Sequence, residues 1–214
     1  RAFTLRCPAL DVFVHLQTHG DFLDYHLSRN SLGHYRLGAG ARLLGHELQP
    51  GQTLRLRIRS NPSFHDPEPE RPMILIGHGT GLAGLVVHLK ARRQLRREGS
   101  VKPGETWLLY GERSVEHDNH LGDKLESWLD EGVLQRLDRA YSRDADTSAR
   151  YVQDLIRLHE DALRKWVTLR GAAIYVCGRR DTMAAGVHEA LQAALGNAVL
   201  QALHTSGRYR RDVY

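Results

Sequence analysis

The sequence predicts an α/β fold: a parallel sheet covered by helices, preceded by a shorter part that is rich in β-strands. Three short apolar runs, residues 73–77, 106–112 and 171–178, alternate with segments in which apolar residues recur at helical spacing. Such alternation is typical of right-handed βαβ units built around a parallel sheet. Earlier in the chain, apolar and arginine residues alternate strictly over residues 54–59, which is the period of a half-buried strand.

The segment HDPEPERP, residues 65–72, divides these two parts. It holds three prolines and four charged side chains, which argue against a regular element and indicate a linker. We therefore predict a first domain over residues 1–72 and a second over residues 73–214. The run DVFVHL, residues 11–16, is another candidate strand of the first domain. About three candidates in all are fewer than the roughly five strands that a closed barrel needs, so we expect part of an antiparallel barrel.

Helical periodicity fills the spaces between the apolar runs of the second domain. In chain order, it predicts helices over residues 82–89, 121–129, 152–167 and 183–195. Residues 133–141 fit a strand and a helix equally well. The last helix would place Met183, Val187, Leu191 and Leu195 on one face, with Asp181 or Thr182 as its cap.

The composition is that of a soluble globular protein, with 41% hydrophobic and 26% charged residues among 214. No apolar run approaches the ~20 residues that cross a bilayer, and no signal peptide is recognisable. The first residue is Arg1 rather than Met, which leaves open a longer native chain with a membrane anchor. Two distant cysteines, Cys7 and Cys177, favour a reducing compartment, so we expect the cytoplasm or the cytoplasmic face of a membrane.

The net charge of +5 favours an anionic partner, which is a nucleic acid, a membrane surface or a phosphorylated small molecule. Nucleic acid ranks last, because the basic residues are dispersed and no stripe of basic and aromatic residues occurs. The thirteen histidines are scattered as well, and the one local pair is His117 with His120. Two histidines three apart in a polar loop are more often solvated than ligating, so we predict no metal site.

The stretch MILIGHGTGLAG, residues 73–84, is the strongest candidate for a binding site. Gly79, Gly81 and Gly84 satisfy the pattern GxGxxG between a strand and a helix. There, backbone N–H groups and the helix dipole favour a phosphate, and missing side chains let the backbone approach it. The alternative is a tight turn without a ligand. The position of the stretch favours the phosphate, because it opens the first βαβ unit.

Two further features bear on which nucleotide binds. Glu112 stands near the end of the second strand, where a dinucleotide site of NAD type places an acid for the ribose 2′-hydroxyl. Later, Ser142, Arg143, Arg150 and Tyr151 offer a hydroxyl, two cations and a stackable ring within ten residues. That combination suits a 2′-phosphate and an adenine. A solvated turn before a helix explains the same composition equally well.

Five motifs, in the same order and spacing, resemble the ferredoxin-NADP reductase superfamily, and within it the diflavin reductases: GHGTGLAG, YGER, SRD…YVQ, IYVCG…MAAGV and the terminal YRRDVY. The resemblance covers nearly all of residues 36–214. It implies a Rossmann-like NADP domain in which Gly79, Thr80 and Gly81 serve the pyrophosphate and nicotinamide side. The residues that it implies for the adenosine 2′-phosphate and the adenine are Ser142, Arg143, Tyr151 and Gln153. The family commonly has a lysine where this chain has Ala149, and Arg150 is the cation nearest to that place.

Cys177 ends a predicted strand, where a cysteine is usually an inert small apolar residue. The carboxyl end of a strand in an α/β sheet also faces the ligand crevice. The resemblance implies the second role: Cys177 lies beside the nicotinamide and helps to align hydride transfer. It also implies that Asp212 is the acidic partner of Cys177, and that Tyr214 covers the flavin ring until the nicotinamide displaces it.

The first domain resembles the end of a flavin-binding domain. Arg1, Phe3 and Thr4 match the motif RxYS, which implies an arginine for the flavin phosphate, an aromatic ring against the isoalloxazine and a hydroxyl near N5. Phe3 lacks the hydroxyl of the usual tyrosine. The segment GAGARLL, residues 38–44, resembles the pyrophosphate loop; its matching residues are Gly38, Gly40 and Ala41, the last standing where the family has serine or threonine.

The resemblance implies an NADPH-dependent flavoprotein reductase with FAD and NADPH as cofactors. It would pass hydride from NADPH to FAD and single electrons onward to a flavodoxin-like FMN domain, a haem protein or a siroheme protein. Two alternatives stay open at this point. One is a flavin or ferric reductase that uses free flavin as a substrate. The other is a nucleotide-binding redox-partner module without catalysis.

Overall fold

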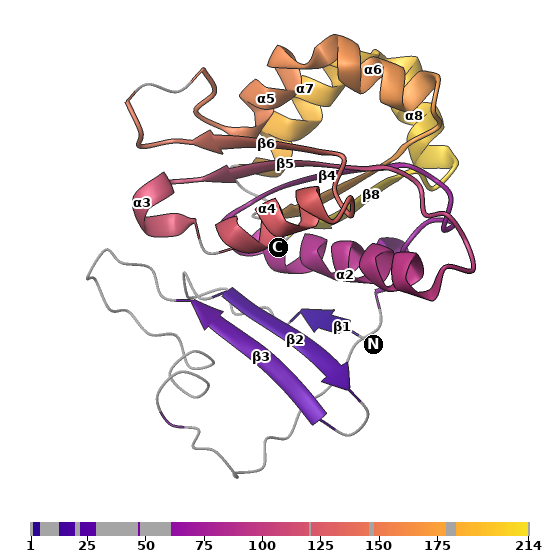
Figure 1. The fold of residues 1–214 in the computed structure, drawn as a ribbon. Coiled ribbons are helices and arrows are strands. Elements are labelled where there is room, and N and C mark those ends of the chain that lie inside the picture. The colour runs from indigo at the N-terminus through magenta and orange to yellow at the C-terminus, as the bar shows by residue number, and fades with distance from the viewer. Residues whose placement is uncertain are drawn as a thin grey trace.

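The structure of the chain is a computed structural model, which describes residues 2–4, 13–19, 22–28, 47, 61–119, 121–145, 148–178 and 183–213. Its main feature is a five-stranded sheet in the order β6-β5-β4-β7-β8 (Figure 1). The strands are β4 (Met73–His78), β5 (Thr106–Glu112), β6 (Arg136–Tyr141), β7 (Ala173–Gly178) and β8 (Tyr209–Val213). Every neighbouring pair is parallel, as the alternation of apolar runs and helices predicts.

Helices cover both faces of this sheet (Figure 1). On one face lie α2 (Leu82–Glu98), α3 (Val115–Asp118) and α4 (Gly122–Asp130). On the other lie α5 (Val152–Leu158), α6 (Glu160–Thr168), α7 (Ala185–Leu195) and α8 (Asn197–Thr205). Strand β4 is the centre of both cores, since Ile74 and Ile76 pack under α5 and α7 while Met73 and Leu75 pack under α2. This explains why its sequence is apolar at every position rather than at alternate ones.

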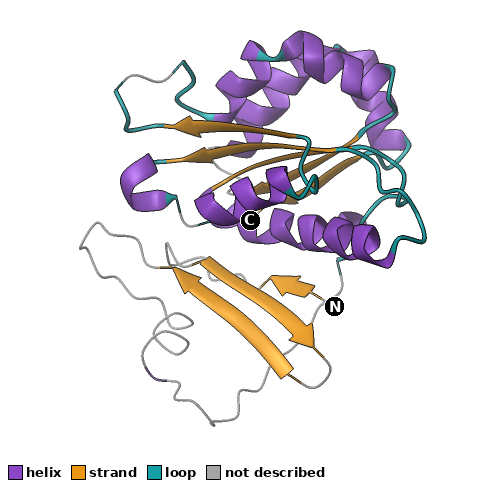
Figure 2. Ribbon diagram, viewed as in Figure 1, coloured by secondary structure: helices purple, strands orange, loops and turns teal. Residues whose placement is uncertain are grey.

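The amino-terminal strands form a separate three-stranded antiparallel sheet in the order β1-β2-β3 (Figure 2). They are β1 (Ala2–Thr4), β2 (Phe13–His19) and β3 (Phe22–Ser28). The strand predicted at residues 11–16 is confirmed as β2, whereas the strand predicted at 54–59 lies outside the described residues. The barrel therefore stays a prediction. Strands β1 and β2 contact α2, and β2 also contacts the short 3-10 helix η3 (Gly79–Gly81) that follows β4.

Two predictions about helices need correction. The helix predicted over 152–167 is broken at His159, whose φ of −113° and ψ of 25° are not helical, and it forms α5 and α6. The break brings His159 Nε2 to 3.0 Å from the Asp138 carboxylate of β6, a contact between segments far apart in the sequence. Helix α7 is also not the last, because α8 follows it after Gly196. The predicted caps of α7, Asp181 and Thr182, lie outside the described residues, and Ala184 before α7 already has helical angles.

The ambiguous residues 133–141 contain strand β6, and the terminal motif forms strand β8. Residues 65–72 contain neither a helix nor a strand, as predicted for HDPEPERP, although their role as a domain boundary remains a prediction. Among the described residues, no helix combines the length and apolar character needed to cross a membrane.

Candidate nucleotide-binding site

The glycine-rich turn lies at the point where the strand order of the sheet reverses. Strand β4 comes before the other strands of this sheet in the sequence, and it has β5 on one side and β7 on the other. The helices that follow β4 and β5 therefore leave toward one face of the sheet, and those that follow β6 and β7 toward the other. Ligands of open α/β sheets bind at such a switch point, outside the carboxyl ends of the strands. The turn predicted to hold a phosphate thus occupies the place where this architecture binds one.

The three glycines of the turn have different physical roles. Gly79 has a φ of +50°, and a β-carbon added there would meet no atom within 4 Å. A β-carbon on Gly84 would lie 2.7 Å from Cys177 Sγ, and one on Gly81 would overlap the Cys177 carbonyl oxygen. Gly81 and Gly84 thus allow α2 to approach β7, while Gly79 provides the left-handed turn beside open space.

The beginning of α2 fits an anionic group. Its N-cap residue is Gly81, which provides no side-chain hydrogen bond, and the first turn carries no acidic residue. The first N–H groups of a helix have no partner within the helix, and the dipole of a helix as long as α2 favours negative charge at that end. Together with the open space beside Gly79, these features make a turn that a pyrophosphate fits.

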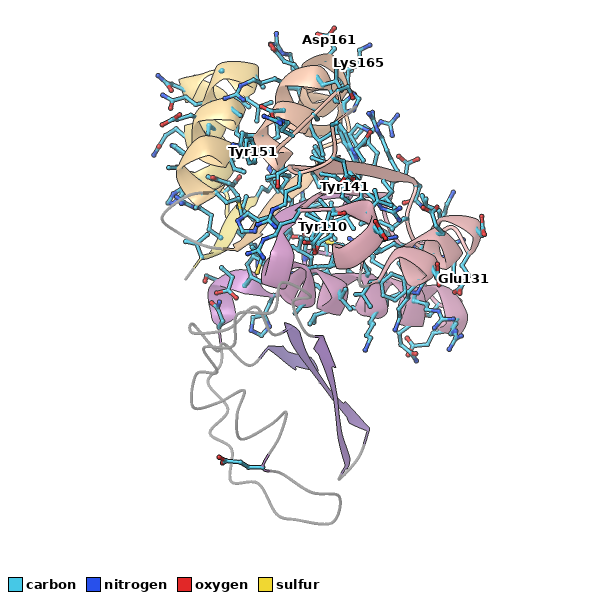
Figure 3. The ribbon with its side chains drawn as sticks, turned by 90° about the vertical axis from the view of Figure 1, so that its left-hand side faces the viewer. Tyr110, Glu131, Tyr141, Tyr151, Asp161 and Lys165 are labelled. Carbon is cyan, nitrogen blue, oxygen red and sulfur yellow. The ribbon has the colours of Figure 1, made fainter. Side chains whose placement is uncertain are left out.

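A buried tyrosine supports this turn from within the sheet. Tyr110, on β5, is 5% exposed, and its hydroxyl lies 3.1 Å from the Gly79 carbonyl oxygen. The same hydroxyl donates to the carboxylate of Glu112, the residue that the sequence singled out at the end of β5. Figure 3 looks onto this edge of the sheet and shows Tyr110, Tyr141 and Tyr151 following one another from the α2 side toward α5. Sequence analysis missed Tyr110, because an aromatic residue within a buried strand resembles any core residue.

The second candidate turn follows β6 and is attached to β5. The Ser142 N–H donates to the Glu112 carbonyl oxygen at 2.9 Å, and the Arg143 N–H donates to the Arg113 carbonyl oxygen at 2.8 Å. With respect to the described residues, the side chains of Arg143 and Arg150 form no hydrogen bond or ion pair. Two arginines that pair with none of the described residues, at one edge of the sheet, are suited to a phosphate dianion. Next to them, burial raises the pKa of Tyr141, so its hydroxyl stays neutral at physiological pH.

Tyr151 and Gln153 stand at the beginning of α5. The Tyr151 ring is 53% exposed, which is uncommon for a large aromatic side chain and leaves a face for stacking. Its backbone caps the helix instead: its N–H donates to the Asp154 carboxylate at 3.0 Å. The Gln153 side chain lies against Gly186 of α7, where a β-carbon would come within 3.4 Å of it. Ala149, which replaces the lysine common in the family, is buried in the core.

Cys177 and Asp212 lie side by side at the same edge. Cys177 is paired with Asp212 between the parallel strands β7 and β8, so their side chains leave the sheet on the same face. Cys177 is 1% exposed and packs against Gly84. The Asp212 carboxylate accepts a hydrogen bond of 3.3 Å from the Asn61 amide, and Asn61 in turn accepts one of 2.6 Å from the Ser63 hydroxyl. The two residues are thus neighbours across β7 and β8, and the roles that the resemblance implies for them beside the nicotinamide remain predictions.

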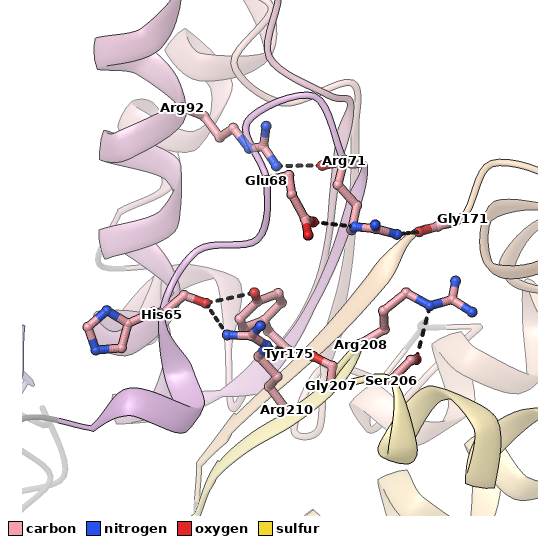
Figure 4. A network of polar contacts seen from close by, with 10 residues as sticks. All are labelled: His65, Glu68, Arg71, Arg92, Gly171, Tyr175, Ser206, Gly207, Arg208 and Arg210. Carbon is pink, nitrogen blue, oxygen red and sulfur yellow. Dashed lines mark hydrogen bonds and ion pairs between the residues drawn. The ribbon is translucent and has the colours of Figure 1, made fainter.

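The segment around the predicted linker is fixed to the sheet beside this pair (Figure 4). The His65 carbonyl oxygen accepts hydrogen bonds from the Tyr175 hydroxyl at 2.8 Å and from Arg210 at 2.9 Å. Asp66 lies 2.7 Å from Nδ1 of the buried His88. Burial lowers the pKa of the nearby Arg92 and raises that of Tyr175. No local sequence pattern indicates these contacts, since their partners lie up to 145 residues apart.

The flavin residues implied by the resemblance are largely beyond the described part of the chain. Phe3 and Thr4 belong to β1, which is described by its backbone only. The residues that lie outside the described part are Arg1, Gly38, Gly40, Ala41 and Tyr214. Thr80 is described by its backbone within η3. The roles proposed for these side chains therefore remain predictions.

Known proteins resemble the chain in the regions that form this site. The family described as "Oxidoreductase NAD-binding domain" matches residues 75–189. The alpha-component of the sulfite reductase [NADPH] flavoprotein from Bacillus subtilis is 34% identical over 193 residues, which is 85% of this chain and 31% of that protein. The same component from Vibrio cholerae is 35% identical over 194 residues, 85% of this chain and 30% of the relative. The same component from Photobacterium profundum is 32% identical over 190 residues, which is 84% of this chain and 30% of that protein.

The chain thus spans less than a third of the length of these relatives. The matched family begins within β4 and ends within α7, so it includes the glycine-rich turn, the turn after β6 and Cys177. The resemblance drawn from the five sequence motifs is confirmed by both findings. This chain belongs to the family of oxidoreductase NAD-binding domains, and its relatives support the resemblance to the diflavin reductase type of the ferredoxin-NADP reductase superfamily.

Proposed function

We propose that the chain is the NADPH-oxidising part of a flavoprotein reductase. The observation that carries this proposal is that three features meet at one edge of the sheet. These are the turn at Gly79, the two arginines without a described partner, and the Cys177–Asp212 pair. A dinucleotide phosphate presents a pyrophosphate, a 2′-phosphate and a nicotinamide, which are the groups that these three features suit.

The binding energy comes chiefly from the phosphates. The N–H groups at the start of α2 hold the pyrophosphate, with Gly79, Thr80 and Gly81 forming the turn around it. Ser142, Arg143 and Arg150 hold the 2′-phosphate, and each charge-assisted hydrogen bond contributes about 1.5–3 kcal/mol. The exposed ring of Tyr151 stacks on the adenine, and Gln153 flanks it. NADH lacks the 2′-phosphate and binds less tightly for that reason.

The remaining residues orient the reacting groups. The chemistry belongs to the bound cofactors, NADPH and FAD, as hydride passes from nicotinamide C4 to flavin N5 and single electrons then leave. Cys177 and Asp212 align the nicotinamide, and Tyr214 covers the flavin ring before the nicotinamide arrives. On the flavin side, Arg1, Phe3, Thr4 and the loop of Gly38, Gly40 and Ala41 hold FAD. Orientation supplies most of the rate, because the two rings must stack at reactive distance.

The names of the relatives favour a second component of a sulfite-reducing assembly as the final acceptor. We propose electron transfer to such a partner, a siroheme or haem protein, through a flavodoxin-like FMN domain. The compartment that we propose is the cytoplasm. A flavin or ferric reductase that takes up free flavin is less favoured, because the relatives are named flavoproteins.

The deciding experiment titrates NADPH and NADH against the wild-type chain and two variants, by calorimetry. Arg143→Ala should weaken NADPH binding at least tenfold and leave NADH binding within about twofold, because one charge-assisted bond to the 2′-phosphate is lost. Arg170→Ala is the matched control, since Arg170 is an exposed arginine that pairs with Glu105, just before the amino end of β5. Equal affinity of the wild type for the two nucleotides would refute the proposed specificity. Flavin content of the purified full-length protein separates a flavoprotein from a reductase of free flavin.

A further inference from the structure

The Tyr110 hydroxyl is the one polar group of an otherwise apolar core side chain, and it points to the candidate site. The tyrosine is buried between α2 and the sheet, among Leu82, Leu108 and Cys177. Its single hydroxyl hydrogen is shared between two acceptors, the Gly79 carbonyl oxygen at 3.1 Å and the Glu112 carboxylate. A phenylalanine would fill the same space without either contact. The hydroxyl therefore has a role beyond packing.

Its contact with Gly79 determines which way the next N–H points. The peptide unit between Gly79 and Thr80 is planar and trans, as no cis bond occurs in the described chain, so its carbonyl and its N–H point in opposite directions. Holding the Gly79 carbonyl toward the buried Tyr110 turns the Thr80 N–H away from the core and toward the crevice. Gly79 has a φ of +50°, which favours glycine, and a β-carbon added there would meet no atom within 4 Å, so no side chain fixes the turn from its outer side.

Glu112 extends this restraint to the second turn. Its carboxylate accepts the Tyr110 hydroxyl, and its own carbonyl oxygen accepts the Ser142 N–H at 2.9 Å. Strand β5 thus contacts both turns: the Tyr110 side chain reaches the turn after β4, and the Glu112 backbone carbonyl holds the turn after β6. Glu112 is also the acid that a site of NAD type would offer to a ribose hydroxyl, and here that carboxylate is engaged by the protein itself.

We propose that Tyr110 and Glu112 form a positioning pair that holds the pyrophosphate turn and the 2′-phosphate turn in one fixed arrangement. This inference rests on the proposed function, since it assumes that one ligand occupies both turns. Its consequence is specific. A ligand that spans both turns depends on the pair, whereas a ligand that occupies the 2′-phosphate turn alone does not.

The experiment measures the affinities of NADP⁺ and 2′-AMP for the full chain by calorimetry. The readout is the ratio of the NADP⁺ affinity to the 2′-AMP affinity. NADP⁺ spans both turns, and 2′-AMP lacks the pyrophosphate. Tyr110→Phe should weaken NADP⁺ binding about threefold to tenfold, the size of one net hydrogen bond, and leave 2′-AMP unchanged. Tyr209→Phe is the matched control: this buried tyrosine at the amino end of β8 also carries a hydroxyl contact, at 3.3 Å from His188 Nδ1.

Two variants of Glu112 separate positioning from charge. Glu112→Gln keeps an oxygen that accepts the Tyr110 hydroxyl and removes a negative charge, which strengthens the binding of both anionic ligands, so the ratio should not fall below the wild-type value. Glu112→Ala removes the competing acceptor and keeps the carbonyl oxygen that holds Ser142, so the Tyr110 hydroxyl donates to Gly79 alone and the ratio should not fall either. The double variant Tyr110→Phe/Glu112→Ala should lower the ratio as Tyr110→Phe does, because the contact with Gly79 is lost in both.

The outcomes distinguish this inference from the proposed function. If the wild type binds both ligands and Tyr110→Phe leaves their ratio unchanged, the positioning pair is refuted while the nucleotide site stands. An equal loss for NADP⁺ and 2′-AMP refutes it too, since it indicates general damage to the fold. If the wild type binds neither ligand, both the site and the pair are wrong.

Discussion

The two ends of the parallel sheet carry similar side chains but arrange them in opposite ways. Toward the amino ends of the strands, Asp138 accepts hydrogen bonds from Trp107 Nε1 at 2.6 Å and from Arg136 Nε at 2.6 Å, and it pairs with His159 at 3.0 Å. At the carboxyl ends, Arg143 and Arg150 have no such partner within the described residues, and the Tyr151 ring is exposed. Polar groups that satisfy one another stabilise the fold, whereas groups left without a partner are available to a ligand.

This contrast predicts that substitutions at the two ends act on different quantities. At the amino end they should lower the free energy of unfolding and leave nucleotide affinity unchanged. At the carboxyl end they should lower nucleotide affinity or the rate of flavin reduction, and leave stability unchanged. A substitution that moved both quantities together would break the distinction.

The largest effect should come from Asp138→Ala. It leaves the Trp107 N–H and the Arg136 guanidinium without their acceptor, so we expect the free energy of unfolding to fall by about 2–4 kcal/mol. Urea unfolding measures this loss. Asp138→Asn is the matched control, because its amide oxygen still accepts from Trp107, and it should cost clearly less. A change below about 0.5 kcal/mol for Asp138→Ala, the size of an ordinary surface substitution, would contradict a stabilising role.

Arg150→Ala should have the next largest effect, on the affinity for NADPH. It removes a cation from the 2′-phosphate, which should weaken binding at least tenfold at low ionic strength and less at high salt. Its unfolding free energy should match that of the wild type, since the side chain has no described partner to lose. Arg157→Ala serves as the comparison, because Arg157 lies near the end of α5 and already pairs with Asp154 at 2.9 Å. If the two variants lose affinity equally, the effect is one of general charge and not of a site.

Cys177→Ala tests a residue at the carboxyl end that should affect the rate of hydride transfer rather than the affinity for NADPH. We expect flavin reduction to slow about tenfold in stopped-flow measurements of flavin-loaded protein, because a misplaced nicotinamide loses the advantage of orientation. The dissociation constant of NADPH should stay near the wild-type value. Cys177→Ser keeps a hydrogen-bonding group of similar size and should reduce flavin faster than Cys177→Ala. A reduction rate that neither substitution changes would leave Cys177 as a packing residue against Gly84.

The sequence predicts the centre of the sheet better than its edges. Strands β4, β5 and β7 are buried on both faces, and their continuous apolar runs identify them. The edge strands β6 and β8 read RLDRAY and YRRDV, because partly exposed strands carry charged residues and lose that signature. The break at His159 accompanies its contact with Asp138, which no local pattern contains.

The candidate site is predictable where the residues belong to one turn and not where they meet across the fold. The glycine pattern locates the phosphate turn, but it does not reveal that Gly81 and Gly84 approach Cys177, more than 90 residues away. Composition leaves Ser142, Arg143, Arg150 and Tyr151 undecided between a site and a solvated turn, and the resemblance to a family favours the site. The contacts of Tyr110 require the parallel pairing of β4 with β5 to be known first.

The smallest effect should come from Tyr151, whose backbone stabilises the fold while its ring is available to a ligand. Its backbone caps α5 by donating to the Asp154 carboxylate, and its ring is exposed. Tyr151→Ala keeps the backbone cap and removes only the ring, so stability should change by less than about 0.5 kcal/mol. NADPH affinity should fall by the stacking energy, about 0.5–1.5 kcal/mol or roughly twofold to tenfold. Tyr151→Phe keeps the ring and should bind like the wild type. NADH carries the same adenine, so Tyr151→Ala should weaken both nucleotides alike, in contrast to Arg150→Ala. A loss confined to NADPH would show that the hydroxyl, rather than the ring, contacts the ligand.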